Sequence, residues 1–560
     1  MNTRLINIIA LFAVVINVLG CASDWLDEDP PHILTVETVY SDLEGFEAGL
    51  NGLYAEVRRE HEGVDHSVNL IKDMFINGTD NVVVNQRGQV PAAGSSLLFE
   101  SWGDLNDPGY LQFEVVFSWL YRIINQANTI IGQAETSSDV EWAGGGASAD
   151  ENKIRVIAEA RAVRAWAYRH LTYGWGDVPL NLEESRGTTI RTDWERNPVE
   201  QVREQVISDF LFAEEVVPIE PVPGRISKGA IQHYLAEMYL VLDKPDSTLY
   251  WADQAINTPE YQLVTERYGV NSSEPGVPYS DMFYDGNANR EEGNTEALWV
   301  FQFARNVTGG GTHAIMRRTH MTAYDVHQVD GVTPLKLTYD RGGRGQPRMS
   351  LTKFAIDAYE PQDDRASEFA MRKFFILNDA DGNSPQEADE LPPGYEYGDT
   401  LWLDWSEDLT YDTRRRTDWP YLRKFEGTDP NDVSSNWQWN DQVYLRLADT
   451  YLLKAEAQFR LGLPGDAAKT INIIRRRSNT SDISADDVDI DFILDERSRE
   501  LALEEHRRWT LLRTNKWLER TQKYNHNGGN LISERDVIFP IPRSVIDANL
   551  TGDMHQNSGF

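Results

Sequence analysis

Two stretches of the sequence combine small and large apolar residues at the spacing of packed helices, and this pattern restricts the fold more than any other feature. The stretch 231–256 carries Leu235, Ala236, Tyr239, Ala252 and Ala255. The stretch 443–478 carries Leu452, Ala455, Ala467, Ala468 and Ile471. Apolar residues three and four positions apart lie on one face of a helix, and alanines facing larger residues let two helices pack closely. Each stretch therefore predicts a helical hairpin, comparable to a repeat unit of about 34 residues.

The same periodicity also marks individual helices, most of them outside the two hairpins. It runs from Leu43 to Val57, from Phe117 to Ala134 and from Leu445 to Phe459, and an alanine-rich helix is expected over residues 154–171. Hairpins of this length resemble tetratricopeptide units, whose stacked helix pairs form a continuous core. The predicted fold class is mainly α: a tetratricopeptide-like scaffold of helical hairpins with long irregular loops and a few short strands.

Residues 258–442 break the helical pattern. This region is rich in Gly, Pro, Asn, Asp and aromatic residues, and within it residues 298–303 are expected to form a short strand. We interpret the region as long surface loops carried by the helical scaffold, which is where binding residues usually lie.

The N-terminus has the pattern of an exported lipoprotein. An apolar run over residues 5–19 follows Arg4, and its length suits a signal peptide better than a membrane span. The run ends at Gly20-Cys21, which resembles a bacterial lipidation site, and Cys21 is the only cysteine. We predict a signal peptide over 1–20, lipid on Cys21, an acidic tether over 21–36 and a single domain over 37–560. The domain divides into a helical part (37–256), a variable loop-rich part (257–442) and a second helical part (443–560).

The charge balance excludes several partners. The chain has 53 basic and 89 acidic residues, a net charge of −36, so phosphate backbones and anionic lipids repel it. We therefore expect no nucleic-acid partner, and contact with the membrane only through the lipid anchor. A single cysteine also excludes an intrachain disulfide and a cluster of thiolate metal ligands.

Candidate catalytic and metal motifs lack the spacing that their chemistry requires. His61 and His66 are five residues apart, so on a helix they diverge instead of sharing a zinc-binding face. Glu496, Glu500 and Glu504 share a helix face, but arginines surround them, which favours a charge-paired structural helix over a di-iron site. No G-x-S-x-G motif is present. We expect no enzymatic activity, no metal site and no cofactor.

Aromatic residues are abundant, with 16 Trp and 23 Tyr. Six tryptophans stand in polar loops: Trp102, Trp402, Trp405, Trp419, Trp437 and Trp439. An exposed aromatic ring offers a flat apolar platform for a sugar, and Asp, Asn or Arg beside it can bond the hydroxyl groups. The alternative is that such rings are buried and hold the loops in place.

Five segments carry a recognisable pattern in a fixed order. They run from Cys21 to Asp27, from Glu159 to Tyr168 with the turn Gly176 to Leu180, from Tyr444 to Asp449 with Leu452 to Ala457, from Glu496 to Glu504, and from Phe539 to Pro542 with Ile546 to Asn549 and the terminal Asn557 to Phe560. Together they resemble the SusD/RagB family of outer-membrane lipoproteins of Bacteroidota, and they extend through nearly the whole chain.

The resemblance implies a single helical domain without catalytic activity. It implies a lipoprotein facing the cell exterior that captures oligosaccharides and delivers them to a TonB-dependent outer-membrane transporter of the SusC type. Some members bind peptides, so a peptide-binding lipoprotein is an alternative, as are a surface glycoside hydrolase and a protein-binding scaffold. The lack of a motif that pairs an acid with a nucleophile argues against the hydrolase, and the long aromatic loops argue against the scaffold.

The resemblance also implies a ligand site formed by loops of the first quarter of the chain and of the variable middle. By position, Trp102 corresponds to the stacking platform, and Asp80, Arg87 and Asp104 correspond to partners of sugar hydroxyls. A carboxylate accepts hydrogen bonds from hydroxyl groups and a guanidinium donates to them. Tyr324 is added from a polar loop of the middle region. For each residue the alternative is a structural role in fixing its loop.

Overall fold

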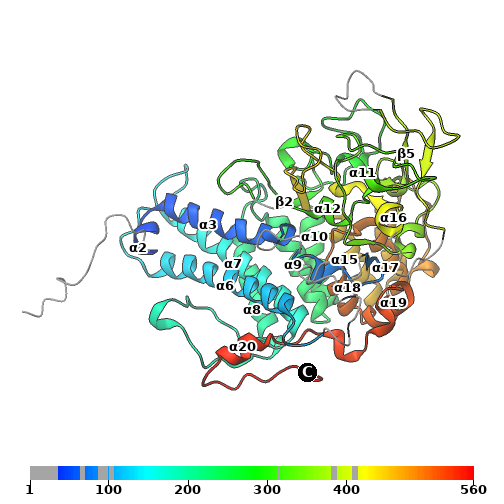
Figure 1. Ribbon diagram of the computed structural model, residues 1–560. Helices are drawn as coiled ribbons and strands as arrows, with labels where there is room; N and C mark the ends of the chain where they lie inside the picture. The colour runs from blue at the N-terminus through cyan, green and yellow to red at the C-terminus, as the bar shows by residue number, and fades with distance from the viewer. Residues whose placement is uncertain are drawn as a thin grey trace, which may run out of the picture.

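The computed structural model describes residues 36–63, 70–85, 99, 102, 106–311, 314–379, 388–406 and 414–560. The predicted signal peptide, Cys21 and the tether up to residue 35 lie outside these ranges. Figure 1 shows long helices side by side at one end of the molecule and the irregular chain of the middle region at the other. None of the helices in the described ranges is both long and apolar enough to cross a membrane.

Four long helices pack together in the N-terminal part. They are α3 (Leu43–Arg58), α6 (Leu111–Thr136), α7 (Ala149–Trp175) and α8 (Val199–Val216). Side-chain caps fix two of their starts: Asp42 accepts a hydrogen bond from the N–H of Gly45 at 2.8 Å, and Ser148 forms a capping box with Glu151. Helix α7 ends at Gly176, whose positive φ of 71° favours glycine. The helices predicted from periodicity in this part are confirmed.

Both predicted hairpins are present, and they pack against each other. One consists of α9 (Lys228–Val241) and α10 (Pro245–Ile256), the other of α15 (Leu447–Arg460) and α16 (Pro464–Arg477), with α10 in contact with α15. Ala236, Ala252 and Ala457 are fully buried in the cluster that joins the hairpins. Pro245 and Pro464 open the second helices, where the missing N–H removes no helical hydrogen bond.

The helix that the periodicity predicts from Leu445 begins later than expected. Leu445 belongs to strand β8 (Gln442–Arg446), which pairs antiparallel with β2 (Ala297–Phe301), and α15 begins at Leu447. Pairing with a distant strand satisfies the backbone groups of Leu445 and overrides the local helical pattern. Strand β2 confirms the short strand expected near 298–303, although it ends two residues earlier.

The middle region holds short elements between long loops. They are α11 (Pro278–Asp281), α12 (Met316–His320), β3 (Met349–Leu351), α13 (Lys353–Asp357), β4 (Met371–Arg372), β5 (Phe374–Ile376), β6 (Thr400–Trp402), α14 (Arg414–Thr417) and β7 (Tyr421–Leu422). The strands form two-stranded antiparallel pairs, β4 with β7, β5 with β6, and β3 with β1 (Val82–Val84). The remaining α-helices of the described chain are α2 (Val36–Val39), α4 (Asp73–Ile76), α17 (Ile490–Leu501), α18 (Arg507–Arg513), α19 (Trp517–Tyr524) and α20 (Arg543–Ala548).

Candidate functional site

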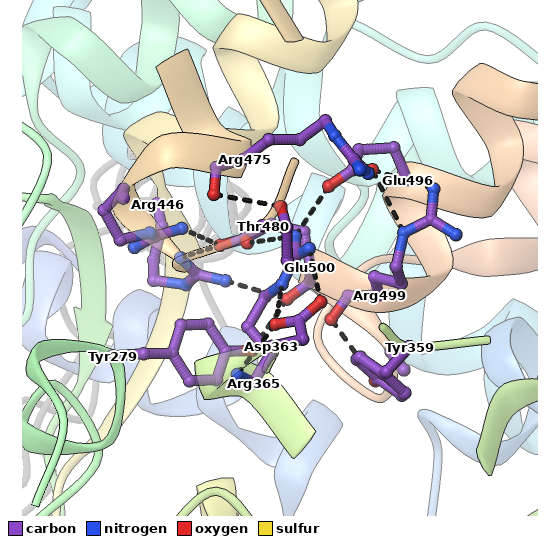
Figure 2. Close-up of polar contacts among 12 residues, drawn as sticks. Tyr279, Tyr359, Asp363, Arg365, Arg446, Arg475, Thr480, Glu496, Arg499 and Glu500 are labelled. Atoms are coloured by element: carbon purple, nitrogen blue, oxygen red, sulfur yellow. Dashed lines mark hydrogen bonds and ion pairs between the residues drawn. The ribbon is translucent and has the colours of Figure 1, made fainter. Parts of the chain in front are cut away.

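The glutamates of α17 are part of a buried ionic network, as the sequence predicts. Glu496 and Glu500 are fully buried, and Figure 2 shows them among arginines that come from separate segments. Arg365 contacts both carboxylates, at 2.7 Å for Glu496 and 3.2 Å for Glu500, while Arg475 and Arg446 each bond one of them. Burial alone would raise the pKa of Glu496, but the positive charges, led by Arg365, lower it to about 2. These carboxylates stabilise the helical core instead of forming a di-iron site.

Glu60, His170 and His506 form a second buried polar cluster, with the composition of a metal site. One ligand atom from each lies within 4.8 Å of the others. However, His506 Nε2 lies 2.7 Å from a Glu60 oxygen, and the indole N–H of Trp509 donates to His170 Nδ1 at 3.1 Å. Because an indole only donates, a neutral His170 carries its proton on Nε2 and presents no lone pair there. Burial lowers the pKa of both histidines well below the usual range, so the cluster is a hydrogen-bonded network of neutral rings.

His61, from the zinc-like motif, is also a structural core residue. It is fully buried, with Nδ1 2.7 Å from the side-chain oxygen of Gln442 and Nε2 3.0 Å from the ammonium of Lys72. Both ring nitrogens are thus engaged within the chain. His66 lies outside the described residues.

The predicted site residues Asp80 and Trp102 come together on one face of α19, inside the protein. Asp80 is fully buried, and its carboxylate accepts hydrogen bonds from Arg507 at 2.7 and 2.8 Å and from Arg520 at 2.7 Å. Burial alone would raise the pKa of Asp80, but these two guanidinium groups lower it. Trp102 is fully buried, and its ring centroid lies 5.4 Å from that of Trp517. This placement favours the structural alternative, in which both residues anchor their loop to α19.

The other three predicted residues are separate from this pair. Tyr324 lies in a different apolar cluster, fully buried, with its ring centroid 4.9 Å from that of Phe375. Its hydroxyl oxygen accepts a long hydrogen bond, 3.5 Å, from the N–H of Thr338. Arg87 and Asp104 lie outside the described residues. Ligand contact stays a prediction for all five residues.

A cavity of about 820 Å³ opens in the middle region, where the sequence predicts binding loops. Four aromatic side chains line it: Tyr284, Tyr339, Phe369 and Trp439. They come from four loops, the one after α11 and those before β3, β4 and β8. Segments that are far apart in the sequence therefore meet at this cavity. Tyr339 exposes 51% of its surface, which leaves ring area open to a ligand. We call this site the loop cavity.

Fixed polar groups complete the wall of the loop cavity. The Glu426 carboxylate lies 2.5 Å from Arg423 and 2.9 Å from Arg372. Burial alone would raise the pKa of Glu426, but these guanidinium groups lower it to about 2, so the carboxylate is a permanent acceptor. Gly342 has a φ of +81°, and a Cβ there would lie 2.3 Å from Glu426 Cγ, so only glycine allows this approach. Within the described chain, the buried Thr428 hydroxyl in this wall has no hydrogen-bond partner.

Of the four aromatic residues that line the loop cavity, the sequence pattern indicated only Trp439. Of the six loop tryptophans, Trp439 lines the loop cavity, whereas Trp419 is fully buried and Trp402 on β6 is 60% exposed outside it. Tyr284 and Tyr339 were missed, although each is followed directly by an aspartate in a loop-rich region. An aromatic residue followed by an aspartate indicates an aromatic side chain in a loop. This local pattern does not indicate which distant loops form a cavity together.

Comparisons with known proteins agree over most of the chain. A model of the SusD family matches residues 282–560, and a model described as starch-binding associating with outer membrane matches residues 24–240. A SusD-like protein of Formosa agariphila is 24% identical over 561 residues, which covers 97% of each chain. The starch-binding protein SusD of Bacteroides thetaiotaomicron is 39% identical over 125 residues, 21% of this chain and 22% of that protein.

Solved structures share the architecture. A SusD homologue from Bacteroides thetaiotaomicron superposes with a TM-score of 0.68 at 18% identity, covering 94% of this chain and 98% of that chain. Surface glycan-binding protein A from the same organism, in complex with laminarihexaose, gives a TM-score of 0.66 at 18% identity over 92% of this chain and 99% of that chain. At this level of identity the matches establish the fold, and they confirm the predicted mainly helical class.

Proposed function

We propose that this chain, which belongs to the SusD/RagB family, captures oligosaccharides at the cell surface and delivers them to a TonB-dependent transporter in the outer membrane. Glycan-binding proteins of this family are non-catalytic, so the family assignment confirms the expectation that the chain is not an enzyme. The loop cavity is the observation that carries the proposal, because it combines aromatic rings with fixed polar groups on a SusD-like scaffold.

The chemistry of the loop cavity matches what a sugar requires. Its volume of about 820 Å³ falls within the range of about 300–1,000 Å³ typical of small-ligand sites. The rings of Tyr339 and Trp439 can stack on the C–H face of a pyranose. The ionised Glu426 accepts hydrogen bonds from sugar hydroxyls, and the Thr428 hydroxyl can both accept and donate.

Binding to a glycan array, followed by calorimetric titration, tests this function. Laminarihexaose and a malto-oligosaccharide are natural first probes, because a structural neighbour was solved with the former and a relative is named starch-binding. Replacing Tyr339 by Ala should weaken binding about thirtyfold, the loss expected from an aromatic anchor worth about 2 kcal/mol. Tyr250 on α10, 56% exposed, supplies the control, since Tyr250→Ala removes a similarly exposed ring that does not line the loop cavity.

The outcomes of this titration separate the alternatives. Unchanged affinity in a folded Tyr339→Ala variant would remove the loop cavity from the proposal. Binding to a peptide library with no glycan bound would favour the peptide-binding alternative.

The anchor and the transporter complete the proposed function. The apolar run that ends at Gly20-Cys21 supports lipidation of Cys21, and multiple acyl chains give stable anchoring. Cell fractionation should find Cys21→Ala released from the outer membrane, and protease treatment of intact cells should cut the wild-type protein.

Purification in mild detergent should bring down a larger barrel protein together with the wild-type protein. Repeated isolation of the lipoprotein alone would argue against the complex.

A further inference from the structure

Four arginines gather at the end of α12, although they belong to three separate segments: Arg318, Arg344, Arg348 and Arg416. The segment 344–348 runs alongside α12, because the N–H of Arg348 donates to Thr319 O at 2.7 Å and that of Gln346 to Arg318 O at 2.9 Å. The N–H of Ala323, three residues after α12, donates to Arg416 O at 2.8 Å and so brings α14 to the same place. We call these four residues the arginine cluster.

In the part of the chain that the structure describes, no carboxylate forms an ion pair with the guanidinium groups of the arginine cluster. Arg348 is only 5% exposed, and no carboxylate of the described chain forms an ion pair with its guanidinium. Arg416 is partly buried, and its Nε is buried without a hydrogen-bond partner in the described chain. Arg318 bonds only the neutral side-chain amide of Gln346, with Nε at 3.1 Å, and Arg344 is exposed. A buried donor that lacks a partner costs free energy, and a charged one costs more.

The charges that surround the arginine cluster are also mainly positive. Burial and the charges of Arg348, Arg344 and Arg317 lower the pKa of Arg318 to about 10, and none of the main interactions that set this pKa in the described chain is with an acidic group. Burial lowers the pKa of Arg348 as well, with Asp73 opposing this shift and Arg416 adding to it. The only other nearby acid that these interactions identify in the described chain is Asp325, which faces Arg344 and Arg416. Positive charge is thus concentrated here, in a chain whose net charge is −36.

Two other buried arginines, Arg365 and Arg508, have compensating partners of different kinds. Arg365 bonds Asp363, Glu496 and Glu500. Arg508 has no carboxylate, but its guanidinium lies 4.1 Å from the ring centroid of Trp517 and donates to two carbonyls. A carboxylate network or an aromatic ring therefore compensates these charges, whereas in the described chain neither is found for Arg348 and Arg416.

We propose that the arginine cluster binds an anionic substituent, a sulfate ester or a carboxylate, on the captured oligosaccharide. The planar guanidinium fork matches both groups, because it can donate two parallel hydrogen bonds to their oxygens. The cluster adjoins the loop cavity through residues 342–344, since Gly342 lines the cavity and Arg344 belongs to the cluster. This role rests on the proposed function, and it assigns a charged glycan as the ligand class.

Affinity gel electrophoresis tests the charge preference with three probes: laminarin as the neutral glycan, polygalacturonate as the carboxylate and carrageenan as the sulfate ester. The wild-type protein should bind at least one of the two anionic probes, and the one bound identifies the substituent. Salt should weaken this binding. The double variant Arg348→Gln/Arg416→Gln should bind it about tenfold to a hundredfold more weakly, as expected for the loss of hydrogen bonds to a charged group.

Two further variants keep the test independent of folding. Arg476→Gln replaces an exposed arginine that pairs with Asp482, so it also removes one positive charge. This control variant should bind like the wild type. Arg344→Gln changes an exposed side chain, so it should fold normally and still weaken anionic binding several-fold. Binding of laminarin alone would overturn the anionic preference while leaving the proposed function intact. Equal anionic binding by wild type and double variant would overturn the site, and no binding to any glycan would overturn both proposals.

Discussion

Two buried arginines in this protein, Arg365 and Arg348, have opposite surroundings. Arg365 in the C-terminal ionic network is fully buried and contacts three carboxylates, whereas Arg348 in the arginine cluster is almost as buried and contacts none in the described chain. Burial costs both cations their hydration, but among the described residues only the network supplies carboxylates that offset this cost. The difference teaches that burial of an arginine does not imply ion pairing: Arg365 is matched by carboxylates, whereas in the described chain Arg348 is not.

Replacing Arg365 by Gln should have the largest effect on stability. The change leaves Asp363, Glu496 and Glu500 short of a positive partner inside the core, and breaking a buried ion pair typically costs about 3–5 kcal/mol. Urea unfolding followed by circular dichroism measures the loss. Glu519→Gln is the matched control, because Glu519 pairs with Lys516 on the surface and should contribute less than about 1 kcal/mol. A cost below that value for Arg365→Gln would contradict the structural role of the network.

Acid should destabilise the protein in two steps. The buried neutral His170 and His506 have pKa values below the usual 6.5, so the unfolded state binds more protons and stability falls as the pH drops below about 6.5. The carboxylates of Glu496 and Asp449 have pKa values of about 2, so their stabilisation is complete above the unfolded values near 4 and is lost as the pH falls toward 2. Melting temperatures measured from pH 8 to pH 3 check both steps, and a flat profile would contradict them.

Replacing Arg348 by Gln should have a small effect of the opposite sign. The variant removes a largely buried charge that has no ion-pair partner in the described chain, so the free energy of unfolding should rise by about 1 kcal/mol. The same urea titration measures it in the absence of glycan. A loss of several kcal/mol would show that Arg348 is as tightly paired as Arg365 and would remove the contrast between the two groups.

The scaffold could be predicted from the sequence because its signals are local. The helices from Leu43 and Phe117 and both hairpins follow from apolar spacing, and the ionic stripe of α17 follows from arginines beside Glu496 and Glu500. The strand at Leu445 was missed because its partner, Trp299, lies far away in the chain while the local spacing fits a helix.

The site was harder to predict because its determinants are distant in the chain. No sequence feature near Asp80 or Trp102 indicates which residues they contact. Arg507, Arg520 and Trp517 enclose them in the structure but lie more than 400 positions later in the chain. Likewise, the loops that carry Tyr339 and Trp439 are irregular, so no periodicity indicates that they share a cavity. The resemblance assigns the ligand site to loops of the first quarter and of the variable middle, which stays a prediction, and the side chains that line a cavity there depend on tertiary packing.

Calorimetric titration of Trp439→Ala and Trp102→Ala, each paired with a melting curve, tests the central claim most directly. Trp439 lines the loop cavity, so its variant should lose about thirtyfold in glycan affinity at a nearly unchanged melting temperature. Trp102 is fully buried against Trp517, so its variant should lose about 3–5 kcal/mol of stability while its folded fraction binds glycan normally. The reverse result, with affinity lost only in a stable Trp102→Ala variant, would contradict the account and return the ligand site to the first quarter of the chain.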